Sequence, residues 1–306
     1  FINDGFVMLA DFQFILAGAL VGFCVGVTGV GGGSLMTPIL ISFLKVEPHI
    51  AIGTDLLFAA ISKFCGSLVH AKKLNIVWPI VGWLALGSIP ASLGTTWALD
   101  HFMGGAKEYK KLLTIVLGGM LILTGASIIF RGRIEAFFNR HQHDVAGEAV
   151  GADEHSQVIL KHKAWILFMG VMLGILVTLS SVGAGAFGVM ALVLLFPKLP
   201  MIRIIGSDVA HAVLLTLVAG LGHLKSGNVD MHLLVLLLIG SIPTIIIGTL
   251  LSSHLPERAI RRVLGVTLIL LGTNFIVNPV KEKPPVVAPP AAVISPLKHQ
   301  SLIYSI

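Results

Sequence analysis

Long apolar segments dominate the amino-acid sequence, and their length is the feature that most constrains the fold. Several of them reach about 20 residues, the length of an α-helix that crosses a hydrocarbon core about 30 Å thick. Only 12% of the residues are charged, whereas about a quarter are charged in soluble domains. The strands of a transmembrane barrel would instead alternate apolar and polar residues. We therefore expect an all-α integral membrane protein, with helices over residues 12–26, 34–44, 50–69, 76–99, 111–130, 164–180, 185–196, 204–222, 232–252 and 263–279.

The second half of the chain repeats the first. The offset is 152 residues early in the repeat, as between Gly18 and Gly170, and 153 residues later, as between Asp55 and Asp208. Each copy holds five apolar segments, or three spans and one re-entrant hairpin, and either number is odd. An odd number of crossings places the second copy upside down, so we expect two inverted-topology repeats with a substrate site at their interface. Other matching residues are Gly22 and Gly174, Gly53-Thr54 and Gly206-Ser207, and Gly87-Ser88-Ile89-Pro90 and Gly240-Ser241-Ile242-Pro243.

The repeat divides the chain into four parts. They are a first transmembrane repeat at 1–130, a polar connector at 131–163, a second transmembrane repeat at 164–278 and a Pro-rich tail at 279–306, which we expect to be disordered. Residues 1–11 lack the features of a cleavable signal peptide, so we expect none. Most Lys and Arg residues of the loops lie on the face of the connector, although Lys107, Lys110 and Lys111 lie on the other face. The connector is therefore expected to be cytoplasmic.

Two groups of potential metal ligands stand in the sequence. His141, His143 and His155 lie in the connector and could bind a transition metal. The composition around them is more typical of a solvated linker. Cys24 and Cys65 fall inside apolar segments, where a cysteine usually packs as a small hydrophobic residue. We expect neither a metal site nor a disulfide.

The run Gly29-Val30-Gly31-Gly32-Gly33 interrupts the first pair of apolar segments. Glycines at four-residue spacing, such as Gly18, Gly22 and Gly26, let two helices pack closely. Four glycines within five residues exceed that need, and each weakens a helix by about 1 kcal/mol relative to alanine. Non-helical backbone survives in hydrocarbon only where it is buried in protein or lines a cavity. The run therefore predicts a helix break at a cavity or at a tight helix crossing.

Each break precedes a short helix whose N-terminus can bind an anion. Thr28 and Ser34 are natural N-cap residues, and the free N–H groups at such an end carry about half a positive charge. Inverted repeats would bring the two breaks together at mid-membrane, so we expect an anion site between them. The alternative is that both breaks are purely structural. The expected site residues are Thr28, Gly29, Gly31, Gly32, Gly33, Ser34, Lys63, Ser180, Ser181, Gly183 and Gly185.

Four ionisable residues fall at membrane depth, where a charge is expensive and usually functional. Asp55 and Asp208 are repeat mates, and they serve either as structural N-terminal caps or in coupling. Asp208 and His211 are three residues apart on one helix face, so they could share a hydrogen bond and relay a proton. Lys63 lies roughly 12 Å along the helix from Asp55, too far to pair with it, so a bound anion is one candidate partner. We expect His223 at a membrane edge.

Enzymatic and nucleic-acid functions are disfavoured. Ser34 stands where the third glycine of a dinucleotide fingerprint belongs, and no strand precedes it. An intramembrane serine protease needs a reactive Ser with a His base, and neither Ser34 nor Ser181 has a His in its own segment. The basic residues are scattered over short connections rather than gathered in a stripe. We expect no catalysis, no cofactor and no nucleic-acid partner.

The motifs resemble those of the sulfite exporter TauE/SafE family of bacterial membrane transporters. They are the Gly-rich run with Pro38 after it, Gly53-Thr54-Asp55 and Gly87-Ser88-Ile89-Pro90, over about residues 12–278. The resemblance implies a multi-pass protein of the bacterial inner membrane that transports sulfite, sulfoacetate or other organosulfonates. The second copy departs from the pattern, with Ala184 inside the run and Met190 in place of the proline.

We therefore expect a secondary transporter, acting as an exporter of a small sulfur-containing anion by alternating access. A passive anion channel is the alternative, since it would use the same helix ends without a coupling ion. A metal-ion exporter that uses the connector histidines ranks below both. The expected partners are the small organic or inorganic anion and the lipid bilayer, and the oligomeric state is left open between a monomer and a homodimer.

Overall fold

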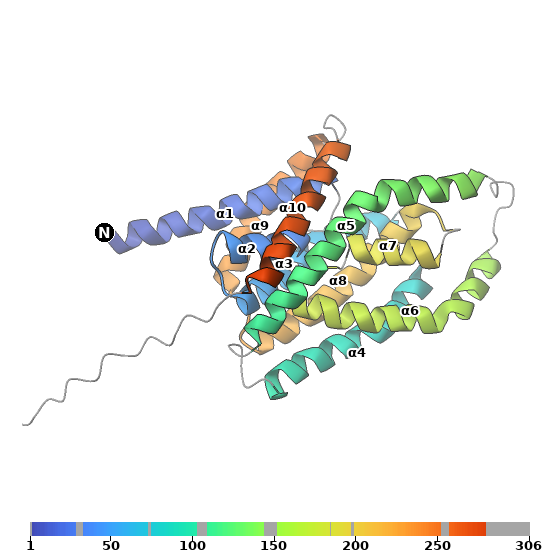
Figure 1. Cartoon of the computed structure of the whole chain (residues 1–306), viewed down its shortest axis with the longest axis horizontal. Coiled ribbons are helices and arrows are strands. Elements are labelled where there is room, and N and C mark those ends of the chain that lie inside the picture. Colours follow the sequence, from blue (N-terminus) through green and yellow to red (C-terminus); the bar gives the residue numbers. More distant parts are fainter. Residues whose placement is uncertain are drawn as a thin grey trace, which may run out of the picture.

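The fold is all helical in the residues that the computed structural model describes, which are 2–28, 33–72, 75–102, 109–143, 152–183, 185–196, 199–251 and 257–279. Only the backbone is described for residues 2–10, 28, 33, 65–66, 68–70, 131–143, 152–161, 186 and 257–258. The helices in Figure 1 are α1 (Ile2–Thr28), α2 (Gly33–Ser42), α3 (Pro48–Lys72), α4 (Trp78–Phe102), α5 (Lys110–His143), α6 (Ala152–Ser180), α7 (Ala186–Leu195), α8 (Met201–Lys225), α9 (Met231–Leu251) and α10 (Glu257–Val277). Each expected apolar segment is a helix, so the all-α prediction is confirmed.

Several helices are long and apolar enough to cross a membrane. Within the described residues five qualify by length and hydropathy, and α1 adds a shorter apolar stretch over Asp11–Val27. By contrast, α2 and α7 have only 10 residues each, and a helix of that length rises about 15 Å, half the thickness of the hydrocarbon core. The protein is therefore a multi-pass membrane protein with two short helices inside it. The spanning candidates are Lys110–Phe130, His162–Ser180, Met201–Lys225, Met231–Leu251 and Ala259–Val277.

The connector between the repeats is more helical than the sequence suggested. α5 continues from the membrane span to His143, and α6 begins at Ala152. The predicted boundaries at 130 and 164 therefore fall inside helices, because polar residues can extend a helix beyond the apolar segment that nucleates it. The side chains of His141, His143 and His155, and the whole of the predicted tail from residue 280 onward, lie outside the described residues.

Glycine contacts join the two halves through α1 with α9 and α4 with α6, pairs that lie side by side in Figure 1. Gly18 and Gly22 of α1 lie against the backbone of Leu237 and Ser241 in α9. The repeat mates α6 and α4 pack in the same way, with the glycines now in the second half and their contacts in the first. Gly170 lies against Leu84, and Gly174 lies against Ser88. Small residues at four-residue spacing allow this close approach. The packing role expected for these glycines is confirmed.

Repeat-equivalent helices also meet each other. Gly53 of α3 lies against the Asn228 carbonyl just after α8, and Gly206 near the start of α8 lies against the Asn75 carbonyl just after α3. The N-terminal part of each helix therefore faces the C-terminal end of its mate, so α3 and α8 run antiparallel. α5 and α10 are also antiparallel, with Gly118 meeting Gly272 and Gly125 meeting Gly265. Two hydrogen bonds between the halves are equivalent in the same way. Val77 N–H donates to Ser207 Oγ at 2.8 Å, and Asp230 N–H donates to Thr54 Oγ1 at 3.1 Å.

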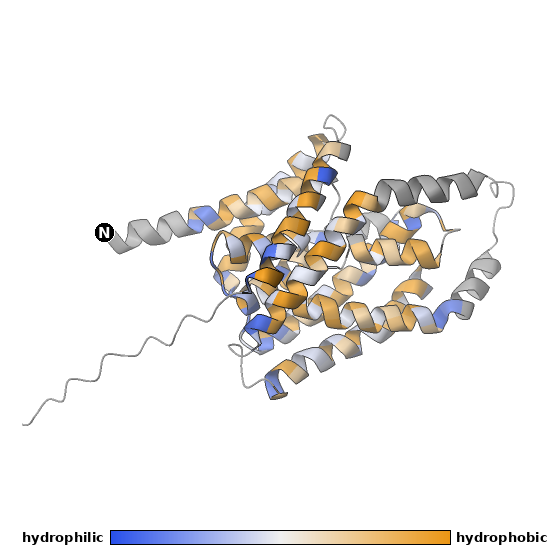
Figure 2. Cartoon of the chain, in the orientation of Figure 1, coloured by the Kyte–Doolittle hydropathy of each residue, from blue (hydrophilic) through white to orange (hydrophobic). Residues whose placement is uncertain are grey.

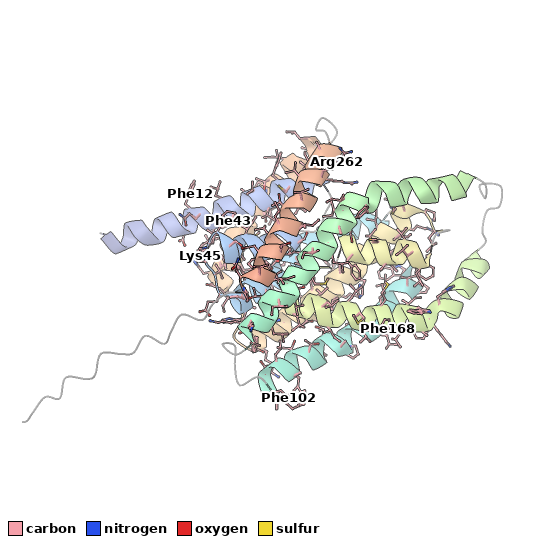
Figure 3. The ribbon with its side chains drawn as sticks, viewed as in Figure 1. Phe12, Phe43, Lys45, Phe102, Phe168 and Arg262 are labelled. Carbon is pink, nitrogen blue, oxygen red and sulfur yellow. The ribbon has the colours of Figure 1, made fainter. Side chains whose placement is uncertain are left out.

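The outer surface of the helices is apolar. Figure 2 shows that hydrophobic residues predominate along the helices of the bundle, and Figure 3 shows Phe12, Phe102 and Phe168 projecting from its outer helices. These side chains are 61%, 76% and 56% exposed. An apolar surface of this extent would be a liability in water, whereas it suits the lipid tails of a bilayer.

A substitution in α4 tests the close approach of α4 and α6. Gly87→Ala places a methyl group on the Leu167 carbonyl oxygen, so we expect the free energy of unfolding to fall by about 1–3 kcal/mol. Gly94→Ala in the same helix is the matched control, because nothing lies within 4 Å of the added Cβ, and alanine favours the helix. The measurement is thermal unfolding of the purified protein in detergent. Equal midpoints for the two variants would contradict this packing.

Candidate functional site

Asp55 lies inside α3 and turns its carboxyl group toward α2. The Thr37 hydroxyl of α2 donates a hydrogen bond to Asp55 Oδ2, and both side chains are fully buried. The prediction that Asp55 and Asp208 cap their own helices is wrong. α3 begins at Pro48, and the N-cap of α8 is Pro200, so both carboxyl groups lie about two turns inside their helices. The helices begin earlier than the apolar pattern indicated, so neither aspartate lies at the first turn of its helix.

Asp208 occupies the equivalent position in α8 but has different neighbours. Its Oδ1 atom lies against Gly188 in the first turn of α7, where a side chain would collide with the carboxyl group. The repeat mate of Thr37 is Val189, which has no hydroxyl to donate. Within the described part of the chain, Asp208 Oδ2 is buried and has no hydrogen-bond partner. The two aspartates thus face the two short helices with different chemistry.

Lys63 brings a positive charge to this pair. It interacts electrostatically with Asp208 of α8 and, more weakly, with Asp55 of its own helix. Spacing along one helix predicted no direct pair between Lys63 and Asp55. It did not point to Asp208 as a partner, because that interaction depends on the antiparallel crossing of α3 and α8. We call Asp55, Lys63 and Asp208 the charged cluster.

His211 does not form the expected pair with Asp208. Its Nε2 atom shares a hydrogen bond with Ser88 Oγ of α4 at 2.8 Å, and no hydrogen bond links it to Asp208 among the described residues. α8 packs against α3, α4, α6 and α7. Its Asp208 and His211 side chains therefore face different neighbours. The proposed proton relay between Asp208 and His211 is therefore not supported by the structure.

His223 is buried inside the protein. It has no exposed surface, and its Nε2 atom lies 3.0 Å from the Thr178 carbonyl oxygen at the end of α6. α8 packs against α6 over this part of its length. His223 lies in the last turn of α8, at the end of the candidate span Met201–Lys225, so its membrane-edge position stays a prediction. Only the polar character of His223 could have indicated this contact from the sequence.

The break in the second half is described in detail. α6 ends at Ser180, Ser181 has a φ of 58°, and Gly183 has a φ of 110°. The Ser180 hydroxyl is 3.1 Å from the Val182 N–H, which donates to it. Gly185 forms the N-cap of α7 and provides no side-chain hydrogen bond. The chain therefore leaves the helix where the sequence predicted, and a non-glycine residue holds a left-handed conformation there, which is common at functional sites.

The break in the first half has the same position in its repeat. α1 ends at Thr28 and α2 begins at Gly33, within one residue of the start expected at Ser34. Ser34 is buried, in the first turn of α2. The predicted site residues Gly29, Gly31 and Gly32 lie outside the described residues, and only the backbone of Thr28 and Gly33 is described.

The described residues offer no typical transition-metal site. No group of three or more His, Cys, Asp or Glu side chains comes together among them. The charged cluster instead combines two carboxylates with an ammonium group, next to hydroxyls. Such a set favours electrostatic binding of small ions rather than coordination of a soft metal.

Comparison with known families identifies the class of protein. The family described as Sulfite exporter TauE/SafE matches residues 14–275. The chain belongs to this family. The match covers both repeats and the connector, so the resemblance seen in the glycine and aspartate motifs is confirmed.

Relatives in this family carry transporter names. A protein of Bacillus subtilis named Probable membrane transporter protein YjnA is 34% identical over 262 residues, which cover 86% of this chain and 98% of the relative. A Probable membrane transporter protein of Xylella fastidiosa is 27% identical over 264 residues, or 85% of this chain and 92% of the relative. No solved structure matches the chain. Family and relatives together indicate a membrane transporter.

The hydrogen bond between Thr37 and Asp55 can be tested by an isosteric change. Thr37→Val removes the donor to a buried carboxyl oxygen, so we expect the free energy of unfolding to fall by about 1–3 kcal/mol. Thr37→Ser should retain most of the stability. Thr114→Val is the matched control, because the buried Thr114 hydroxyl bonds only the Lys110 carbonyl of its own helix. Thermal unfolding in detergent measures all three, and a Thr37→Val variant as stable as the control would rule out a contribution from this bond.

Proposed function

We propose that this membrane transporter is a secondary transporter that exports a small sulfur-containing anion by alternating access. The proposed substrate is sulfite, which the family description names, or sulfoacetate or another organosulfonate, as the resemblance in the sequence implies. The observation that carries the proposal is the buried charged cluster at the crossing of α3 and α8, next to Thr37 of α2 and the first turn of α7. Charges at membrane depth are expensive and mark ion and substrate pathways.

Two short helices and one cation support binding of an anion near the cluster. α2 and α7 each begin at a break, and helix N-termini attract anions through their free N–H groups. Lys63 adds an ammonium group, which the second repeat lacks because Thr216 stands at that position. The proposed anion contacts are Ser34, Lys63, Ser180 and Ser181 among the residues whose side chains are described, together with Thr28, Gly29, Gly31, Gly32, Gly33, Gly183 and Gly185 at the breaks.

Inverted repeats are the proposed basis of alternating access. The antiparallel course of α3 with α8 and of α5 with α10 supports this arrangement, because repeat mates then run in opposite directions. The equivalent glycine contacts in the pairs α1–α9 and α6–α4 support it as well. In transporters of this type, one repeat rocks against the other around a fixed site near the midplane. A bacterial inner-membrane location, with the connector in the cytoplasm, completes the proposal.

Flux measurements distinguish the transporter from a channel. Purified protein in proteoliposomes should move radiolabelled sulfite or sulfoacetate at a rate that saturates with concentration. Unlabelled anion on the far side should accelerate the flux by counterflow. A rate that rises linearly and shows no counterflow would identify a passive anion channel and reject the transporter.

Lys63 provides a residue-level prediction. Lys63→Met removes the ammonium group from the proposed site, so we expect the affinity for the anion to fall about tenfold or more, as for loss of a charged hydrogen-bond donor. The measurement is equilibrium binding of the radiolabelled anion. Lys45→Met is the control, because the Lys45 ammonium bonds the Ser42 carbonyl at 2.7 Å on the exposed surface.

A double variant separates loss of an anion ligand from damage to the cluster. Lys63→Met alone leaves Asp208 without its electrostatic partner. Adding Asp208→Asn removes the unbalanced carboxylate while the ammonium stays absent. Anion binding that remains weak in the double variant supports a direct role for Lys63, whereas full recovery would show that Lys63 acts only through Asp208.

A further inference from the structure

Two buried oxygen atoms on opposite sides of the repeat interface have no hydrogen-bond partner among the described residues. They are Asp55 Oδ1 in α3 and Ser181 Oγ at the end of α6. Asp55 is 0% exposed and Ser181 is 3% exposed. A buried polar atom without a partner costs about 1–3 kcal/mol. Two of them that face the same place indicate a bound species that would contact both.

The two side chains do face each other. The Ser181 hydroxyl interacts with the Asp55 carboxyl group, although the atoms do not reach hydrogen-bond geometry. The other carboxyl oxygen of Asp55, Oδ2, already accepts the Thr37 hydroxyl. Oδ1 is therefore the free ligand position of the carboxylate, and Ser181 Oγ is the nearest free oxygen from the opposite repeat.

The backbone around Ser181 adds negative potential. Ser181 follows the last residue of α6 and is held in a left-handed conformation. The C-terminal end of a helix carries about half a negative charge, and its last carbonyl groups have no intrahelical donor. Val177 O accepts Ser181 N–H at 2.7 Å, and Thr178 O contacts His223 Nε2. The carbonyls of Leu179 and Ser180 are the remaining members of this last turn.

The charge of the cluster selects a monovalent cation. Asp55 and Asp208 contribute two negative charges when ionised, and Lys63 contributes one positive charge, so one negative charge is left over. An unbalanced charge is very costly in a low-dielectric interior. One monovalent cation restores neutrality, whereas a divalent cation would leave an excess positive charge. All of the available atoms are oxygens, which suit hard cations.

A proton could balance the same charge, but the geometry favours a larger ion. Asp55 Oδ1 and Ser181 Oγ are two buried oxygens from opposite repeats beside the C-terminal end of α6. Together they offer the several oxygen ligands that a cation takes, whereas a proton needs only one acceptor. In secondary transporters, unwound backbone and helix C-terminal ends are recurring sodium ligands.

We propose that Asp55 and Ser181, with the C-terminal end of α6, form a sodium site that joins the two repeats. Thr37 holds the carboxylate in place through Oδ2, and Lys63 remains with Asp208. The site deepens the proposed function, since the role of sodium as the coupling ion rests on transport of the anion. Sodium neutralises the cluster next to the proposed anion contacts, so bound sodium raises the affinity for the anion.

Sodium binding can be measured without any anion substrate. Detergent-purified protein in choline chloride should bind radiolabelled Na⁺ at a single class of saturable site. Unlabelled K⁺ should displace the radiolabel less well than the same concentration of unlabelled Na⁺. Asp55→Asn should abolish binding, and Ser181→Ala should weaken it about tenfold. Asp100→Asn and Ser127→Ala are controls, because the Asp100 carboxylate accepts Ser226 Oγ at an exposed position and the Ser127 hydroxyl bonds the Leu123 carbonyl of its own helix.

The outcomes separate this site from the proposed function. Absence of saturable Na⁺ binding by the wild type, or unchanged binding in folded Ser181→Ala, would overturn the sodium site even if Asp55→Asn fails to fold. Anion flux that responds to a pH gradient but not to Na⁺ would assign the charge balance to a proton and also overturn it. Saturable Na⁺ binding without any flux of sulfite or sulfoacetate would retain the site and reject the proposed substrate.

Discussion

The antiparallel crossing of α3 and α8 is the interaction on which the rest of the structure depends. Gly53 and Gly206 allow each helix to approach the backbone that follows its mate, and a side chain at either position would force the helices apart. At this crossing Lys63 of one repeat interacts electrostatically with Asp208 of the other. The interaction would weaken if the helices separated, so the glycines that permit packing also bring the charged cluster together.

The two repeats share a framework but differ in chemistry. The same glycine contacts recur with the halves exchanged, whereas the polar groups do not. Thr37 has Val189 as its mate, and Lys63 has Thr216. Asp55 consequently has a hydroxyl donor, while Asp208 has the ammonium group. In the proposed mechanism the shared scaffold rocks between two equivalent arrangements, and the asymmetric side chains let these arrangements bind different ions.

Sequence patterns predicted the helices, the breaks and the packing glycines, because each depends on local properties of the chain. Apolar segment length identifies the helices, and a glycine cluster identifies a break wherever unpaired backbone must be buried. The contacts of Lys63, His211 and His223 were not predicted correctly. Each of these contacts joins two helices. It therefore depends on the angle at which the helices cross and on how far one helix is shifted along the other, which residue spacing within a single helix does not reveal. The helical ends of the connector were missed because hydropathy marks the membrane span and not the end of the helix.

The central claim is that the anion binds at the breaks beside the charged cluster and reaches this place from both sides of the membrane. Ser34→Cys in a Cys24→Ala, Cys65→Ala background places one thiol in the first turn of α2. Labelling of this thiol by a membrane-impermeant methanethiosulfonate reagent, applied from either side of oriented membranes, is the most direct test. We expect labelling from both sides and protection by a transported organosulfonate such as sulfoacetate. Labelling from one side only, or a rate unchanged by saturating amounts of the transported anion, would contradict it.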